Sequence, residues 1–159
     1  MSNPPAAYTG LQKHLHWAVV LLLLLQYLLF DGMGRPFHQL MDGAAAYSTT
    51  VFAHIVIGVA VLLLALWRLA LRARHGAPAA PAGEPRLFAQ VSKVAHGLLY
   101  VLLIGLPVIG LVAWFGKLGA AAEAHEFGTT VLMWLALLHV AAVVVHQFWW
   151  KTNLLRRMV

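Results

Sequence analysis

The sequence contains no cysteine, and only 10% of its 159 residues are charged. Without thiols the chain cannot form a disulfide framework, a zinc–thiolate site or an iron–sulfur cluster held by thiolates. A soluble domain usually carries about 25% charged residues, so this composition argues strongly against an ordinary soluble enzyme. Hydrophobic residues make up 62% of the chain instead. The length suits one domain, covering residues 1–159.

The few charged residues leave four long gaps without Asp, Glu, Lys or Arg. These gaps cover residues 14–30, 43–67, 94–116 and 127–150. A helix needs about 20 mostly apolar residues to cross the hydrocarbon core of a bilayer, and residues 8–13 can extend the shortest gap through the headgroup layer. We therefore predict an all-α, four-helix transmembrane bundle of up-down-up-down topology. Its helices are expected at about residues 9–30, 49–73, 90–115 and 125–150.

Transmembrane strands do not fit the pattern. Residues 21–25 are consecutive leucines, whereas barrel strands alternate apolar and polar side chains. Helices satisfy their own backbone polar groups in lipid, so they are the remaining solution. The connection at residues 31–50 is expected to hold one short surface helix, and that at 117–124 to be a brief loop.

Charge placement indicates the orientation in the membrane. In a four-span arrangement nine basic residues fall on one side, namely Lys13, Arg68, Arg72, Arg74, Arg86, Lys93, Lys151, Arg156 and Arg157. The other side has two basic residues and four acids, namely Arg35, Lys117, Asp31, Asp42, Glu123 and Glu126. Under the positive-inside rule both termini are cytoplasmic. Topology thus explains the net charge of +6, and we expect lipid rather than nucleic acid as a partner.

Nine histidines are many for so apolar a chain. An imidazole within the membrane needs a partner, so it indicates a functional site by default. The neutral ring is a ligand for haem iron, and without cysteine a haem would be held non-covalently by axial histidines.

Histidine spacing predicts two metal centres at different depths. His125 and His139 are 14 residues apart, which returns the helix to within roughly 40° of the same face and about 21 Å along its axis. His54 lies early in the second span, near the outer surface, and His16 lies early in the first, near the inner surface. The predicted pairs are therefore His54 with His125 outside and His16 with His139 inside.

Other residues leave alternatives open. His96 and His146 also fall in the inner half, where either could replace a member of the inner pair or bind a quinone or a propionate. His14 is expected at the interface, and His38 and His75 in solvent. Small residues follow three of the predicted ligands, namely Gly58, Gly128 and Ala142. They would admit a flat macrocycle or simply allow close helix packing.

At these residues the chain resembles the bacterial di-haem cytochrome b561 family over nearly its whole length. The motifs that carry the resemblance are His16-Trp17, His54 with Gly58, Arg68 with Arg72, His96-Gly97, residues 106–112, His125-Glu126, Leu138-His139 and residues 148–156. The resemblance implies two haem b groups bound by His16, His54, His125 and His139 in a bacterial inner membrane. It also implies electron transfer between a periplasmic-side donor and ubiquinone or a similar quinone.

Three other functions compete with this interpretation. Some family members are similar to a superoxide oxidase that reduces ubiquinone, although the acidic outer face would repel an anion. The second alternative is a subunit that anchors a dehydrogenase or hydrogenase, which implies a redox protein partner. The third alternative is a haem-free transporter that relays protons through its histidines.

Overall fold

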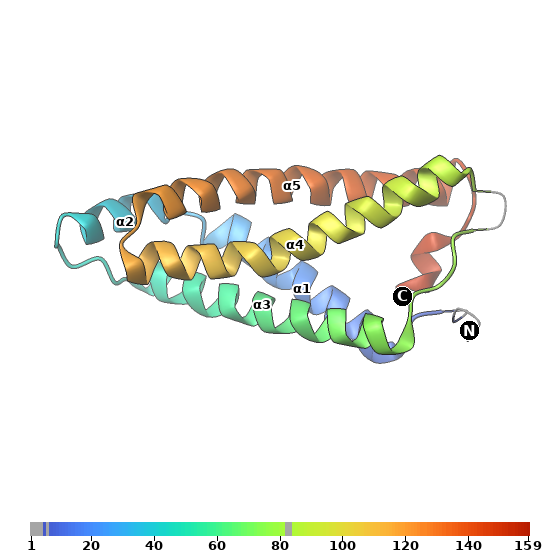
Figure 1. Cartoon of the computed structure of the whole chain (residues 1–159), viewed down its shortest axis with the longest axis horizontal. Coiled ribbons are helices and arrows are strands. Elements are labelled where there is room, and N and C mark those ends of the chain that lie inside the picture. Colours follow the sequence, from blue (N-terminus) through green and yellow to red (C-terminus); the bar gives the residue numbers. More distant parts are fainter. Residues whose placement is uncertain (1–4, 6, 82–83) are drawn as a thin grey trace.

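The computed structural model describes residues 5, 7–81 and 84–159, and these form helices joined by short connections (Figure 1). The four long helices are α1 (Gly10–Leu29), α3 (Thr49–His75), α4 (Arg86–Gly116) and α5 (Gly119–Phe148). The short helix α2 (Gly34–Met41) and the 3-10 helix η1 (Leu154–Arg157) lie at opposite ends of the bundle. By length and composition α3, α4 and α5 can each cross a membrane, and α1 gives a fourth span together with α2, which is bent from it by 71°. The predicted all-α transmembrane bundle is confirmed.

Local signals set the helix ends. Thr9 and Gln12 form a capping box at the start of α1, and the Ser48 hydroxyl accepts a hydrogen bond from the Val51 amide at the start of α3. Lys117 has a φ of 51°, and this left-handed residue ends α4.

The expected loop at residues 117–124 was wrong in extent. Only Lys117 and Leu118 separate α4 from α5, because the alanine-rich residues 120–122 are strong helix formers and extend α5 beyond its apolar core. Similarly, α4 begins at Arg86 rather than near residue 90. The short helix expected in the first outer connection is present as α2.

The helices pack in chain order. α1 packs on α3, α3 on α4 and α4 on α5, around a core that includes Val19, Val61, Leu103, Leu106 and Leu132. Within the described ranges, α1 and α5 form no extensive contact, nor do α3 and α5. The bundle therefore has an open side between α1 and α5, and neither diagonal pair, α1 with α4 or α3 with α5, is in extensive contact among the described residues.

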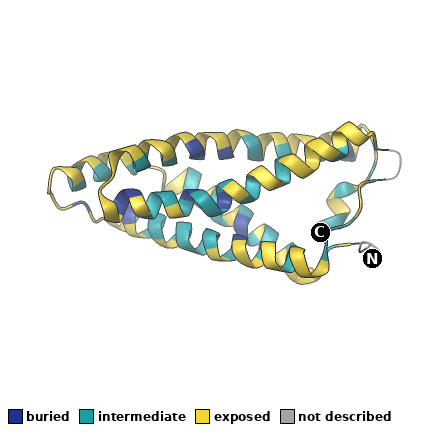
Figure 2. Ribbon diagram, in the orientation of Figure 1, coloured by how far each residue is buried: buried dark blue, intermediate teal, exposed yellow. Residues whose placement is uncertain are grey.

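The outside of the bundle is apolar. Figure 2 shows exposed residues along all the long helices, and among them Leu28 is 74% and Trp134 60% exposed. Hydrocarbon is the solvent that suits such a surface. The start of α1 and the 3-10 helix η1 lie at the end opposite α2 (Figure 1), where the Trp17 indole donates a hydrogen bond to the Met158 carbonyl at 2.8 Å.

Candidate cofactor-binding site

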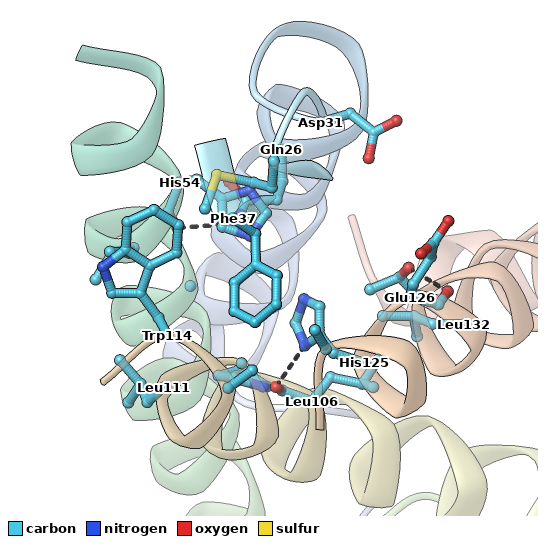
Figure 3. Close-up of a pocket in the computed structure, with 18 of the residues that line it drawn as sticks. Gln26, Asp31, Phe37, His54, Leu106, Leu111, Trp114, His125, Glu126 and Leu132 are labelled. Carbon is cyan, nitrogen blue, oxygen red and sulfur yellow. Dashed lines mark hydrogen bonds between the residues drawn. The ribbon is translucent and has the colours of Figure 1, made fainter. Parts of the chain in front are cut away.

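A cavity of about 420 Å³ lies at the end of the bundle that α2 covers. His54 of α3 and His125 of α5 both line it, with ring centroids 6.2 Å apart and planes at 64°. Figure 3 shows them beside Phe37 of α2 and Trp114 of α4. The structure thus brings together the two histidines that depth alone paired at the outer surface.

Both rings are held by their Nδ1 atoms. His54 Nδ1 lies 2.8 Å from the carbonyl oxygen of Phe30. His125 Nδ1 lies 2.9 Å from the carbonyl oxygen of Leu106 (Figure 3). A carbonyl can only accept, so each Nδ1 carries the hydrogen. Each Nε2 then keeps its lone pair, as a neutral imidazole ligand to a metal requires.

The local backbone explains why these carbonyls are available. Phe30 is the C-cap of α1, where helix carbonyls lose their intrahelical partners. Leu106 lies inside α4, and its carbonyl oxygen has a second lone pair that can accept a hydrogen bond from His125. A Cβ at Gly110 would lie 2.9 Å from Cε1 of His125, so the glycine leaves room for the ring. The Pro107–Gly110 segment is therefore the surface against which the His125 imidazole packs.

The outer pair fits a bis-histidine haem. An iron about 2 Å from each imidazole nitrogen would place the two ring centroids roughly 6 Å apart, close to the observed separation. Gly58 lines the cavity, as a flat macrocycle would require. Gly128 does not, because the Leu106 side chain fills the space where its Cβ would stand, so helix packing explains that glycine.

Polar residues that the sequence did not single out also line this cavity. Gln26 of α1 donates from Nε2 to the His54 carbonyl at 2.9 Å, while its Oε1 is buried without a hydrogen-bond partner in the described part of the chain. Tyr27 donates its hydroxyl to the Thr129 carbonyl at 2.6 Å and so joins α1 to α5 across the open side. The signal was available, since Gln26 is the one amide in a long run of apolar residues.

The rim of the cavity is acidic. Asp31, Glu123 and Glu126 line it and are solvent-exposed, and Figure 3 shows Asp31 and Glu126 at its edge. Exposed His38 of α2 also reaches it. Three carboxylates at the entrance give it a negative potential.

At the inner level three histidines gather rather than two. His139 of α5 and His96 of α4 have ring centroids 5.2 Å apart. His16 of α1 lies within electrostatic range of both. His96 Nδ1 donates to the Ser92 carbonyl of its own helix at 2.6 Å, whereas His16 Nδ1 is buried with no partner among the described residues. The Nδ1 atom of His16 is therefore available to a hydrogen-bond partner from outside the described residues.

Helix packing favours His16 over His96 as the partner of His139. α4 and α5 pack closely, so a macrocycle between His96 and His139 would have to force them apart. The side between α1 and α5 is open by comparison. The separation of 5.2 Å is also shorter than an intervening iron requires.

His14, His75 and His146 lie away from these two centres. His146 is buried below the inner level, where Nδ1 lies 3.0 Å from the Thr152 hydroxyl and Nε2 3.7 Å from a carboxylate oxygen of Glu84. Its ring stands edge-on to Trp150 at 4.5 Å. His14 and His75 are exposed, as expected.

Comparison with known proteins gives a consistent family. A family model described as prokaryotic cytochrome b561 matches residues 7–159. A cytochrome b562 of Cereibacter sphaeroides is 34% identical over 161 residues, covering 100% of this chain and 98% of that protein. A probable superoxide oxidase CybB of Yersinia pestis is 24% identical, with 96% and 95% of the two chains covered.

Proposed function

Because the chain belongs to the prokaryotic cytochrome b561 family, we propose that it binds two haem b groups and carries electrons between a periplasmic-side donor and the quinone pool. Membership establishes a multi-pass protein of the bacterial inner membrane that takes part in membrane electron transfer. The two haems, the quinone and the direction across the membrane are the proposal.

Histidines gathered at two levels are the observation that supports it. We assign His54 and His125 to the outer site and His16 and His139 to the inner site. A haem b bound at each level would supply reversible one-electron chemistry at its iron. The chain contributes the axial nitrogens and fixes their tautomer through backbone carbonyls at the outer site.

The core between the levels excludes water. Val19, Val61 and Leu103 pack there. Burial among such side chains lowers the local dielectric, which is one of the factors that set the redox potential of a bound haem. The levels are about 21 Å apart along the helices, by the 14-residue spacing on α5. One site thus faces each surface, which is the arrangement that transfer across a membrane needs.

A quinone reaches such a protein through the lipid. The exposed apolar side chains of the long helices lie in the same hydrocarbon that dissolves a quinone tail. We place the acceptor on the inner side, where basic residues dominate, and the donor on the outer side.

Haem stoichiometry and a spectroelectrochemical titration of the purified protein test this function. We expect two b-type haems per chain, two resolvable midpoint potentials, and reoxidation of the reduced protein by a short-chain quinone. Protein that stays colourless after expression with ample haem would contradict the proposal and restore the haem-free proton relay. A single haem per chain would contradict the two-site arrangement.

Superoxide is a second candidate donor, because a relative is named a probable superoxide oxidase. Superoxide is an anion, and the carboxylates of Asp31, Glu123 and Glu126 at the outer rim oppose its approach. Fast, haem-dependent reduction by superoxide would support it. Co-purification of a dehydrogenase or hydrogenase would instead indicate an anchoring subunit with a protein donor.

A further inference from the structure

α3 carries a basic residue at the depth of the inner site. Arg68 follows His54 by 14 residues, the same interval that separates His125 from His139 on α5. This interval corresponds to about 21 Å and nearly the same helix face. α5 therefore presents an imidazole at both levels, whereas α3 presents an imidazole at the outer level and a guanidinium at the inner one.

The contacts of Arg68 agree with this placement. It lies within electrostatic range of all three inner histidines, namely His16, His96 and His139. Its Cζ stands 5.9 Å from the ring centroid of Tyr100 on α4. The guanidinium is thus half-buried inside the bundle, where an ionised side chain needs a partner.

None of the five Asp and Glu side chains, all of them in the described part of the chain, supplies that partner. Four of the five acids, Asp31, Asp42, Glu123 and Glu126, belong to the outer end. The fifth, Glu84, lies against His146. Among the described residues Arg68 has no ion pair and no hydrogen bond, and Arg72 one turn later adds a second positive charge. Together with the unpartnered Nδ1 of His16, the described residues of the inner level offer donors and positive charge without an Asp or Glu acceptor.

We propose that Arg68 binds an anionic carboxylate at the inner level, that of a propionate on the haem held by His16 and His139. This inference rests on the proposed function. A planar guanidinium donates two parallel hydrogen bonds to a carboxylate, which an ammonium cannot reproduce. A phospholipid phosphate offers similar oxygens, but Arg68 faces the histidines of the interior rather than the lipid.

The test compares Arg68→Gln and Arg68→Lys with Arg74→Gln, which removes an exposed charge from the same end of α3. Each purified holoprotein is titrated spectroelectrochemically, its haem content is measured, and its propionate bending bands are recorded by resonance Raman spectroscopy. Bound phosphorus per chain reports any lipid phosphate.

We expect Arg68→Gln to lower the inner midpoint potential, because removing a positive charge favours the oxidised iron. It should also weaken retention of the inner haem about tenfold or more, as loss of a charge-assisted hydrogen bond predicts. Arg68→Lys should keep most of the potential but shift one propionate band. The outer haem and the Arg74→Gln protein should behave as wild type.

Several outcomes would overturn the inference. Equal inner midpoint potentials in the Arg68→Gln and Arg74→Gln proteins would overturn it. Propionate bending bands that are unchanged in the Arg68→Lys protein would also overturn it. A fall in bound phosphorus with an unchanged inner potential would assign Arg68 to a lipid instead. If the Arg68 variants keep two haems with unchanged potentials and propionate bands, this inference alone is overturned. A colourless wild-type protein would overturn the proposed function as well.

Discussion

Gly110 and His125 are in contact across the interface between α4 and α5, so that any Cβ at residue 110 would lie 2.9 Å from the imidazole Cε1. The same turn of α4 supplies the Leu106 carbonyl that holds the ring by Nδ1. One short segment of α4 thus fixes both the position and the tautomer of a histidine on α5.

Gly110→Ala should displace His125 and disturb the outer haem while sparing the inner one. A contact under 3 Å cannot persist, and the ring can move only by losing its hydrogen bond to Leu106. Haem content and electron paramagnetic resonance of the oxidised protein will report the change. Gly105→Ala is the matched control, because nothing stands within 4 Å of a Cβ there. Similar spectra for both variants would refute the seating role.

Substitution of single ligands should separate the two haems. His125→Ala should lose the outer haem and largely keep the inner one, and His139→Ala should do the reverse, because we propose that each supplies an axial nitrogen at one level only. The measurement is haem per chain with the midpoint potential of the haem that remains. If both variants kept two full haems, the pairing would be wrong.

The fold could be predicted because bilayer thickness and charge are strict constraints. A span needs a minimum length without charges, so residues 94–116 and 127–150 could be identified from composition alone. The start of α5 could not. Helix α5 extends beyond the hydrocarbon boundary and includes Glu123 and Glu126. In that region the hydropathy of the sequence no longer indicates whether the backbone is helical.

Depth along a helix predicted the outer pair but did not resolve the inner one. Among the described residues the rings of His54 and His125 face each other at the outer level, where counting residues along the helices places both, and their pairing at one haem stays a prediction. At the inner level His16, His96 and His139 share one depth, and only helix packing distinguishes them. The carbonyl partners were also beyond sequence reasoning, since Phe30 and Leu106 contribute backbone atoms rather than side chains.

His16→Ala and His96→Ala should have unequal effects on the inner haem. We expect His16→Ala to abolish low-spin bis-histidine ligation there, because the open side between α1 and α5 is where a macrocycle fits. His96→Ala should leave two low-spin haems and change the inner potential only modestly. Electron paramagnetic resonance with haem quantification distinguishes these results. If only the His96→Ala variant lost the inner haem, the axial ligand would be His96 of α4 rather than His16 of α1.

Tyr27→Phe should weaken the bundle at its open side. The Tyr27 hydroxyl bonds to the Thr129 carbonyl at 2.6 Å and is a rare direct link between α1 and α5. Loss of such a bond costs about 1 kcal/mol, so the free energy of unfolding in detergent should fall by roughly that amount. The optical spectra of the haems should not change, since Tyr27 holds no ligand. An unaltered unfolding midpoint would show that the hydroxyl contributes nothing to the closure.

Charge at the outer rim should decide which donors react quickly. Glu123→Gln with Glu126→Gln removes two of the three carboxylates that line the cavity entrance. Repulsion between like charges slows the encounter of superoxide with the carboxylates. Reduction by superoxide should therefore become faster in this variant, on the order of tenfold at low salt. The difference should shrink as ionic strength rises, because salt screens the charges. A cationic donor should show the opposite trend, and a neutral quinol should show none. Stopped-flow reduction at several salt concentrations measures all three. If superoxide reacts equally fast with both proteins at low salt, its electrons enter away from this rim.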